Sequence, residues 1–251
     1  MIYNSSPCNI LHRRLLVSLL LIAFASFFIS ARIARSKAFI ITAYGAEGNG
    51  QTLNTIAIQK AIDACAAQGG GVVVVPKGVF VSGAIFLKKK VNLMIEKDAV
   101  LKGSINQADY PQINTRWEGT EMKFTAALVN GDSLKNVKIY GEGMIDGSGD
   151  AWLQSRQTRD TTRGAVRLGR PRLMGFQNSK GVRVSGLKLH NQAVWCVFIL
   201  YCEDVVLEDL HIRANHNIPS SDGIDIDSSK KVKIRRCDID VNDDCISIGT
   251  N

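Results

Sequence analysis

Short segments that alternate apolar and polar residues recur along the second half of this 251-residue chain. Four of them open with a valine and a second apolar residue two positions later: Val137 and Ile139, Val182 and Val184, Val205 and Leu207, Val232 and Ile234. In the last three a second apolar pair follows: Leu187 and Leu189, Leu210 and Ile212, Cys237 and Ile239. Alternation with a period of two predicts short strands with one buried face.

The spacing of these segments predicts how the strands stack. Their first valines are separated by steps of 45, 23 and 27 residues, and 45 is close to two steps of 23. A repeat of this length, with two short strands and a polar bend, is typical of a solenoid. Each coil of a solenoid buries its inward residues against the neighbouring coils. We therefore predict an all-β solenoid, with matching positions of successive coils about 4.8 Å apart.

The region before the repeats predicts one helix. Residues 54–67 carry apolar side chains at helical spacing, and Gly69 ends the pattern. Such a helix would cap the first coil, whose strand edges are otherwise unpaired. The following Gly69-Gly70-Gly71 is not a phosphate loop, because it lacks the Lys-Ser/Thr pair and leads into a strand of valines.

Residues 105–165 interrupt the repeat twice, and arginines gather toward the end of this region. Insertions between solenoid coils usually emerge on one face and often shape a binding cleft. Six arginines lie between positions 156 and 172, against one acid, Asp160. This charge either favours an anionic ligand or belongs to a solvated loop.

Three aspartates are the candidates for chemistry. Asp222 and Asp243 are 21 residues apart, close to one coil, so we expect them on the same face of neighbouring coils with Asp244 beside them. Three interpretations of this cluster stay open. One protonated and one ionised carboxyl group can hydrolyse a glycoside. Several carboxylates can bind calcium, and aspartates also satisfy backbone groups at solenoid corners.

The residues around these aspartates resemble those of glycoside hydrolase family 28, the polygalacturonases. The most specific motifs are Ser221-Asp222-Gly223-Ile224-Asp225 and Asp243-Asp244-Cys245-Ile246-Ser247-Ile248-Gly249. Tyr44-Gly45-Ala46, the helical segment 57–62 with its GGG-VVVVP continuation, and Trp195 extend the resemblance from about Ile41 to Asn251.

This resemblance implies a right-handed parallel β-helix that hydrolyses α-1,4-linked galacturonate in pectin with inversion. It assigns the general acid to Asp243 and the activation of water to Asp222 and Asp244. It implies an acidic polysaccharide as substrate, with no cofactor and no metal, and we expect a monomer. Whether cleavage occurs within the polymer or at its ends is left open.

The sequence also departs from the family pattern. Ser220-Ser221-Asp222 stands where the family has Asn-Thr-Asp, and Asn242 stands where it has glycine. The later Gly-His-Gly and Arg-x-Lys motifs of the family are absent from these residues. We therefore expect residues 39–251 to be an incomplete glycosidase domain, truncated at its C-terminal end. We expect the chain alone to hydrolyse pectate poorly or not at all.

Three alternative functions stay open at this point. A pectate lyase-like β-helix would use calcium and an arginine base. A non-catalytic carbohydrate-binding β-helix, or an inactive fragment, would retain the substrate without cleaving it. The third alternative is hydrolysis of a related polymer such as rhamnogalacturonan or xylose-decorated pectin.

Residues 1–38 are typical of a signal peptide. Arg13-Arg14 precedes the apolar run Leu15–Ile29, which at about 15 residues is shorter than the roughly 20 of a membrane span. Ser36-Lys37-Ala38 offers a cleavage site, with an uncleaved anchor as the alternative. Five charges of the net +8 lie here, and the remaining +3 indicates no nucleic-acid partner. We expect a secreted or periplasmic protein, free of the membrane after cleavage.

Five cysteines follow this segment: Cys65, Cys196, Cys202, Cys237 and Cys245. An odd number predicts at least one free thiol, and no spacing indicates a zinc site. Cys237 occupies an inward repeat position, which predicts a buried, inert thiol. Trp195 is likewise expected in the core, because large aromatic side chains are mostly buried.

Overall fold

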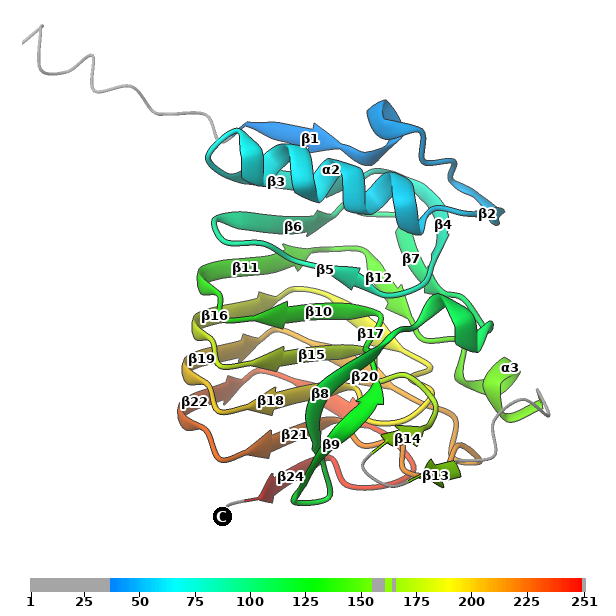
Figure 1. The fold of residues 1–251 in the computed structure, drawn as a ribbon, viewed down its shortest axis with the longest axis vertical. Helices are drawn as coiled ribbons and strands as arrows, with labels where there is room; N and C mark the ends of the chain where they lie inside the picture. Colours follow the sequence, from blue (N-terminus) through cyan, green and yellow to red (C-terminus); the bar gives the residue numbers. More distant parts are fainter. Residues whose placement is uncertain (1–36, 155–160, 164–165, 250–251) are drawn as a thin grey trace, which may run out of the picture. The chain divides into compact units, whose positions relative to one another are not determined.

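The computed structural model describes residues 37–154, 161–163 and 166–249, which form a right-handed parallel β-helix (Figure 1). Three parallel sheets, here called A, B and C, form its walls. Sheet A contains β1 (Ala38–Ile40), β3 (Gly71–Val75), β6 (Val91–Ile95), β11 (Lys135–Gly141), β16 (Lys180–Ser185), β19 (Glu203–Glu208) and β22 (Lys230–Arg235). Sheet B contains β2 (Asn49–Leu53), β4 (Gly78–Ser82), β7 (Ala99–Gly103), β12 (Met144–Asp146), β17 (Lys188–His190), β20 (His211–Arg213) and β23 (Asp238–Asp240). Sheet C contains β5 (Ile85–Phe86), β10 (Val129–Asp132), β15 (Met174–Gln177), β18 (Val197–Leu200), β21 (Ile224–Asp227) and β24 (Ile246–Gly249).

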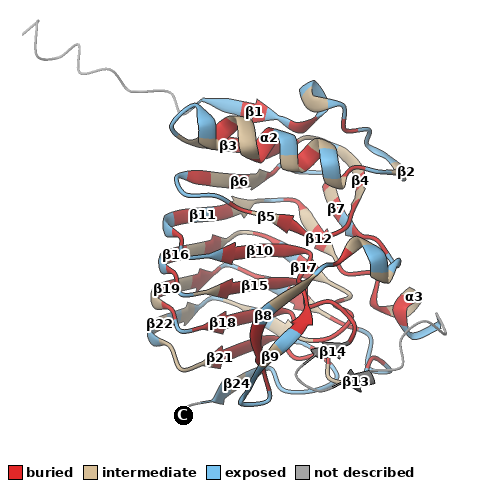
Figure 2. Cartoon of the chain, viewed as in Figure 1, coloured by how far each residue is buried: buried red, intermediate tan, exposed pale blue. Residues whose placement is uncertain are grey.

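The predicted apolar pairs stack in register through the core. Val137 pairs with Val182 in sheet A, and the same column continues to Val205 and Val232. In Figure 2 the strands of the central coils alternate between buried and less buried residues. One expectation was wrong. The 45-residue step from Val137 to Val182 is a single coil that carries an insertion, because these two valines are direct partners.

Each coil turns at residues in the left-handed conformation. Asn178, Tyr201 and Ser228 follow β15, β18 and β21, with φ of 52°, 52° and 46°. Asp209 and Arg236 take the same conformation after β19 and β22. A left-handed residue reverses the local curvature of an extended chain, so a bend needs few residues. These corners are the polar bends that the repeat predicted.

The predicted capping helix is α2 (Thr55–Ala67). It buries Ile58, Ala61, Ile62 and Cys65, whereas Ile56, which we expected on the apolar face, is 72% exposed. Gln59 covers the edge of sheet C. Its side chain accepts a hydrogen bond from Phe86 N (2.9 Å) and donates one to Phe86 O (3.1 Å), as a neighbouring strand would. The helix therefore closes the edge that β5 would leave open.

We expect Gln59→Ala to lower the free energy of unfolding by about 1–3 kcal/mol, because it leaves a backbone donor and an acceptor of β5 without partners. Urea unfolding of the variant measures this loss. Lys60→Ala, an exposed change on the same helix, should alter stability by less than about 0.5 kcal/mol. Equal effects of the two substitutions would contradict the capping role of Gln59.

The insertions form a separate layer outside sheet C. The hairpin of β8 (Gln112–Trp117) and β9 (Thr120–Thr125) crosses in front of β15 and β18 (Figure 1). β14 (Val166–Leu168) and β13 (Thr161–Arg163) extend it into a four-stranded sheet. The remaining short elements are η1 (Ile41–Tyr44), η2 (Gln107–Asp109) and α3 (Gly149–Gln154).

The outermost described coil is less buried than the others. Val232, Ile234, Cys237 and Ile239 are only half-buried, because no described residue packs on their outer side. The expectation of a fully buried Cys237 was therefore wrong. All five described cysteines are free thiols.

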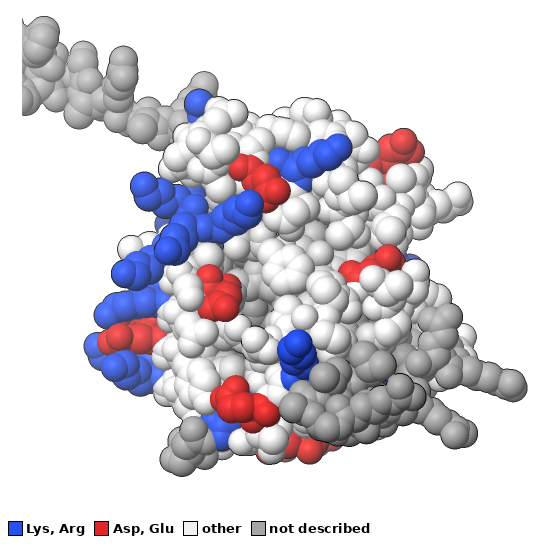
Figure 3. All heavy atoms as spheres, viewed as in Figure 1, with Lys and Arg blue, Asp and Glu red and all other residues white. Residues whose placement is uncertain are grey.

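Charged side chains of both signs lie on the face shown in Figure 3, with lysines and arginines along its left edge. At the turns into sheet A these bases are paired with acids: Lys180 and Lys231 each lie within 3.1 Å of Glu203. No helix within the described ranges is long and apolar enough to cross a membrane. The predicted signal segment lies outside the described residues except for its last two positions. Ala38 already belongs to β1, where it pairs with Val72.

Candidate active site

The outer face of sheet C lines up side chains from six coils. Register places Phe86, Asn130, Gly175, Phe198, Asp225 and Ser247 in one column. A second column two residues along contains Asp132, Gln177, Leu200, Asp227 and Gly249. Ile224 and Ile226 alternate with the two aspartates of β21 and point inward, so both carboxylates face outward.

Asp222 lies opposite Asp244 rather than Asp243. β21 pairs Ile224 with Ile246, and Gly223 N donates to Asp244 O at 2.9 Å. The coil step at this point is thus 22 residues, one more than the distance between Asp222 and Asp243. Gly223 is required here, because a Cβ atom on it would lie 2.5 Å from Cys245 O. The close approach of the coils therefore fixes the backbone that carries Asp222.

Two of the three predicted aspartates line one pocket of ≈ 350 Å³. Asp222 and Asp243 are joined there by Asp225 and Asp227, whereas Asp244 is not part of the lining. Asp222 and Asp225 are 7% and 6% exposed, and Asp243 and Asp244 are exposed. Trp195 also lines the pocket and is only half-buried, so the expectation that it belongs to the core was wrong.

Asp225 is the titratable residue of this pocket that the sequence analysis did not select. Burial raises its pKa to about 9, with the neighbouring carboxylate of Asp222 as the next cause. The pKa of Asp222 is also raised, first by burial and then by the charges of Asp243 and Asp244, while a hydrogen bond from Asp225 lowers it. The two carboxyl groups therefore share a proton that resides on Asp225 and leaves the charge on Asp222. Its outward place between Ile224 and Ile226 was the available signal.

We expect the raised pKa of Asp225 to make the protein less stable as the pH rises. Between about pH 4 and pH 9 the folded chain holds a proton that the unfolded chain has released. The free energy of unfolding therefore falls through this window, by up to about 1.4 kcal/mol per pH unit, and levels off above it. Asp225→Asn should remove this component and gain stability relative to the parent between pH 5 and pH 8.

Urea unfolding of both proteins at pH 5 and pH 8 measures this difference. Asp98→Asn, the same change at a 61% exposed side chain, serves as the matched control. An unaltered pH dependence in Asp225→Asn would show that the native carboxyl group titrates normally.

Arg172 lies beneath the pocket in a stack of aromatic rings. Its guanidinium is 4.0 Å from the ring centre of Phe198, 4.6 Å from that of Trp195 and 5.4 Å from that of Trp117. Trp117 and Trp195 are parallel, with centroids 4.3 Å apart. Burial lowers the pKa of Arg172 to about 9, and the charges of Asp225 and Asp227 oppose this shift. The side chain remains a cation at neutral pH and supports the carboxylates from below.

Of the six arginines noted in the sequence, Arg170 and Arg172 have described side chains, and both are buried. Arg170 Nη1 donates to Ala193 O at 2.7 Å and to Pro219 O at 3.1 Å, and Arg172 Nη2 donates to Arg116 O at 2.6 Å. For these two residues a solvated loop is excluded. The side chains of Arg156, Arg159, Arg163 and Arg167 lie outside the described residues.

The β8–β9 hairpin forms one wall of the pocket. Its tip residues Glu118 and Gly119 belong to the pocket lining. Arg116 fastens the hairpin to β21 through Asp227, with Nη1 3.1 Å from Oδ1 and side chains only 6% and 14% exposed. On the far strand, Glu121 Oε1 accepts a hydrogen bond from Tyr201 Oη at 2.5 Å. The wall is thus braced on both strands.

A buried amide holds the loop that carries Asp222. Gln192 Nε2 donates to Ser221 O at 3.2 Å and to Asp222 O at 3.1 Å. Asn242, in the second motif, bonds back to this loop through its backbone N–H to Ser221 Oγ at 3.3 Å. Ser221 and Asn242, the two departures from the family pattern, therefore contact each other and join the two aspartate segments. Within the described ranges, no group of three or more His, Cys, Asp or Glu residues is arranged to hold a metal ion.

The sequence profile of glycosyl hydrolases family 28 matches residues 65–251. The chain belongs to this family. Among family 28 relatives, a probable polygalacturonase of Vitis vinifera is 30% identical over 87% of this chain and 45% of its own length. An exo-poly-alpha-D-galacturonosidase of Dickeya chrysanthemi is 30% identical over 84% of the chain and 42% of its length. The chain thus spans less than half the length of these two relatives.

Solved family 28 structures share the fold. The family 28 exopolygalacturonase of Yersinia enterocolitica superposes with a TM-score of 0.73 at 27% identity, over 86% of this chain and 45% of that one. The exopolygalacturonase of Thermotoga maritima gives a TM-score of 0.73 at 26% identity, over 84% and 54%. Family 28 membership agrees with the parallel β-helix and with a glycoside hydrolase site on its surface.

Proposed function

We propose that this chain contributes to hydrolysis of α-1,4-galacturonosidic bonds in pectin or polygalacturonate. The observation that carries the proposal is the pocket where Asp222, Asp225 and Asp243 converge beside Trp195. Glycoside hydrolysis needs one carboxyl group to donate a proton and another to accept one. A pocket with aspartates in different environments provides such a difference. The names of the family 28 relatives support galacturonan as the substrate.

In the proposed reaction Asp243 gives its proton to the glycosidic oxygen as the bond to C1 breaks. Asp222, with Asp244 opposite it on the next coil, takes a proton from the water that attacks C1 from the other side. The new C1–O bond therefore has inverted configuration. Asp225 acts as a positioning residue, because the proton it holds keeps the charge on Asp222.

The test is incubation of the protein with polygalacturonate, with reducing ends and the anomer of the product followed by NMR. New reducing ends of inverted configuration support the proposal. An unsaturated product that depends on calcium would instead indicate a lyase, and retained configuration would overturn the inverting mechanism. Binding of oligogalacturonides without any cleavage would establish the non-catalytic interpretation.

We also propose that the chain is exported and acts on its polysaccharide as a monomer. The apolar run of residues 15–29 and the cleavage site that follows it support export. Cell fractionation with N-terminal sequencing tests export, and retention in the cytoplasm would refute it. Sedimentation of the purified chain tests the monomer.

A further inference from the structure

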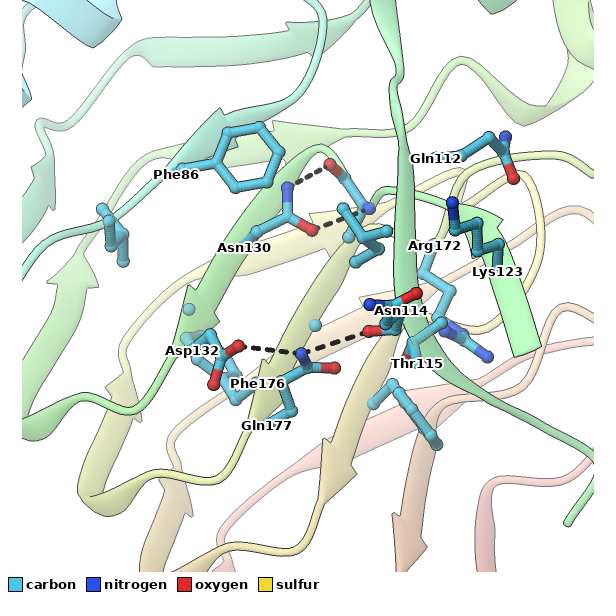
Figure 4. Close-up of a pocket in the computed structure, with 16 residues that line it drawn as sticks. Phe86, Gln112, Asn114, Thr115, Lys123, Asn130, Asp132, Arg172, Phe176 and Gln177 are labelled. Carbon is cyan, nitrogen blue, oxygen red and sulfur yellow. Dashed lines mark hydrogen bonds between the residues drawn. The ribbon is translucent and has the colours of Figure 1, made fainter. Parts of the chain in front are cut away.

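A second cavity lies on the same face of sheet C, on the other side of the hairpin from the aspartates. Its volume is ≈ 530 Å³, within the range of about 300–1,000 Å³ that is typical of sites for small organic ligands. It extends between β8–β9 and the outer face of β10 and β15 (Figure 4). None of the aspartates assigned to the reaction lines it.

The cavity exists because one position of the outward column lacks a side chain. Asn130 and Phe198 stand on either side of Gly175 in that column, and Gly175 leaves a gap between them. A Cβ atom built on Gly175 meets only Ala127 Cβ, at 3.5 Å, and the backbone there does not require glycine. The gap is therefore a feature of the outer surface rather than of the coil packing.

The lining combines phenyl rings with amides and two opposite charges. Phe86 lies at one side and Phe198 closes the cavity toward the aspartates. Gln112, Asn114 and Gln177 carry primary amides, which both donate and accept hydrogen bonds. Gln177 Nε2 already donates to Asp132 Oδ2 at 3.0 Å and to Asn114 O at 3.2 Å, so its carbonyl end is held in place (Figure 4).

The charged groups are at opposite sides of the cavity. Lys123 and Asp132 face each other across it in Figure 4, with Lys123 on the hairpin and Asp132 at the end of β10. Hydrogen bonds from Gln177, Asn178 and Ser133 lower the pKa of Asp132, so its carboxylate is ionised and accepts hydroxyl donors. Lys123 is exposed and can pair with an anionic group.

We propose that this cavity is a binding site for a uronate residue of an acidic saccharide, separate from the aspartate pocket. The sugar carboxylate pairs with Lys123, hydroxyl groups bond to the amides and to Asp132, and the C–H face packs on Phe86. A neutral sugar would lack the ionic contact with Lys123. The site lies two rungs from Asp225, about 10 Å, but the braced hairpin stands between.

Calorimetric titration with trigalacturonate tests the proposal, with the neutral galactose trisaccharide as the comparison ligand. All proteins carry Asp243→Asn, which prevents turnover and leaves this cavity unaltered. Gly175→Leu fills the gap and should weaken binding at this site at least tenfold. Lys123→Gln should reduce the preference for trigalacturonate over the neutral ligand at least threefold, and this preference should also fall with added salt. Lys138→Gln, an exposed lysine on sheet A, is the matched control.

Gly175→Ala adds a single methyl group in ordinary contact with Ala127 and provides a smaller change, and urea unfolding confirms that both variants fold. Binding unaltered by Gly175→Leu, or lost equally in Lys138→Gln, would overturn the proposal. The cavity and the reaction fail separately. Loss of trigalacturonate binding in Gly175→Leu supports the cavity whether or not the parent chain releases reducing ends.

Discussion

Asp243→Asn is expected to lower the rate of polygalacturonate hydrolysis about 10²–10⁴-fold, the contribution typical of a general acid. The amide has no acidic proton for the leaving oxygen, yet it keeps the shape of the pocket mouth. Because Asp243 is exposed and belongs to no described ion pair, folding and substrate binding should be nearly unaltered. Reducing-end release and oligogalacturonide binding, measured on the same preparation, separate the two effects.

Asp204→Asn is the matched control, because Asp204 is a half-exposed aspartate at a turn into sheet A, away from the pocket. The control should hydrolyse at the parent rate. A full rate in Asp243→Asn would remove Asp243 from the reaction. A loss of binding equal to the loss of rate would make it a substrate contact instead.

Arg116→Met is expected to lower the free energy of unfolding by about 3–5 kcal/mol, the range for removing one partner of a buried ion pair. The substitution leaves Asp227, which is 14% exposed, without its cation 3.1 Å away. It also removes the donor to Gly119 O that holds the hairpin tip at 2.9 Å. Urea unfolding followed by tryptophan fluorescence reports both global stability and the environment of Trp117 and Trp195 in the stack.

The double variant Arg116→Met, Asp227→Leu should recover part of this loss, because no buried charge is left unpaired. Lys77→Met is the surface control, since its pair with Asp98 is 79% and 61% exposed and should contribute less than about 1 kcal/mol. If Arg116→Met cost no more than Lys77→Met, the hairpin would not depend on its anchor.

The inward half of this fold could be predicted from the sequence. Alternation identified Val182, Val184 and their equivalents as core residues, and the capping helix was placed within one residue of its start. The unequal coil lengths could not be resolved in the same way, because an insertion of about one coil length cannot be told from an extra coil. The 45-residue step before Val182 was such a case.

The site was predicted in part. Motif and spacing brought Asp222, Asp243 and Asp244 to one place, but the one-residue difference between 21 and 22 decided which of them lies opposite Asp222. Asp225 was missed because its altered pKa comes from burial under a hairpin more than a hundred residues earlier in the chain. Trp195 was misplaced for the same reason, since its partner Trp117 belongs to that hairpin.

The column register also restricts how the length of such a chain can change over evolution. Insertions already occur between β7 and β10 and between β12 and β15, where extra residues leave the coil and return to it. A single residue added within β21 would instead turn Asp225 toward the core and place an isoleucine in the pocket, because neighbouring residues face opposite sides. Descendants of this sequence can therefore vary the walls around the substrate while the strands beneath the aspartates keep a constant length.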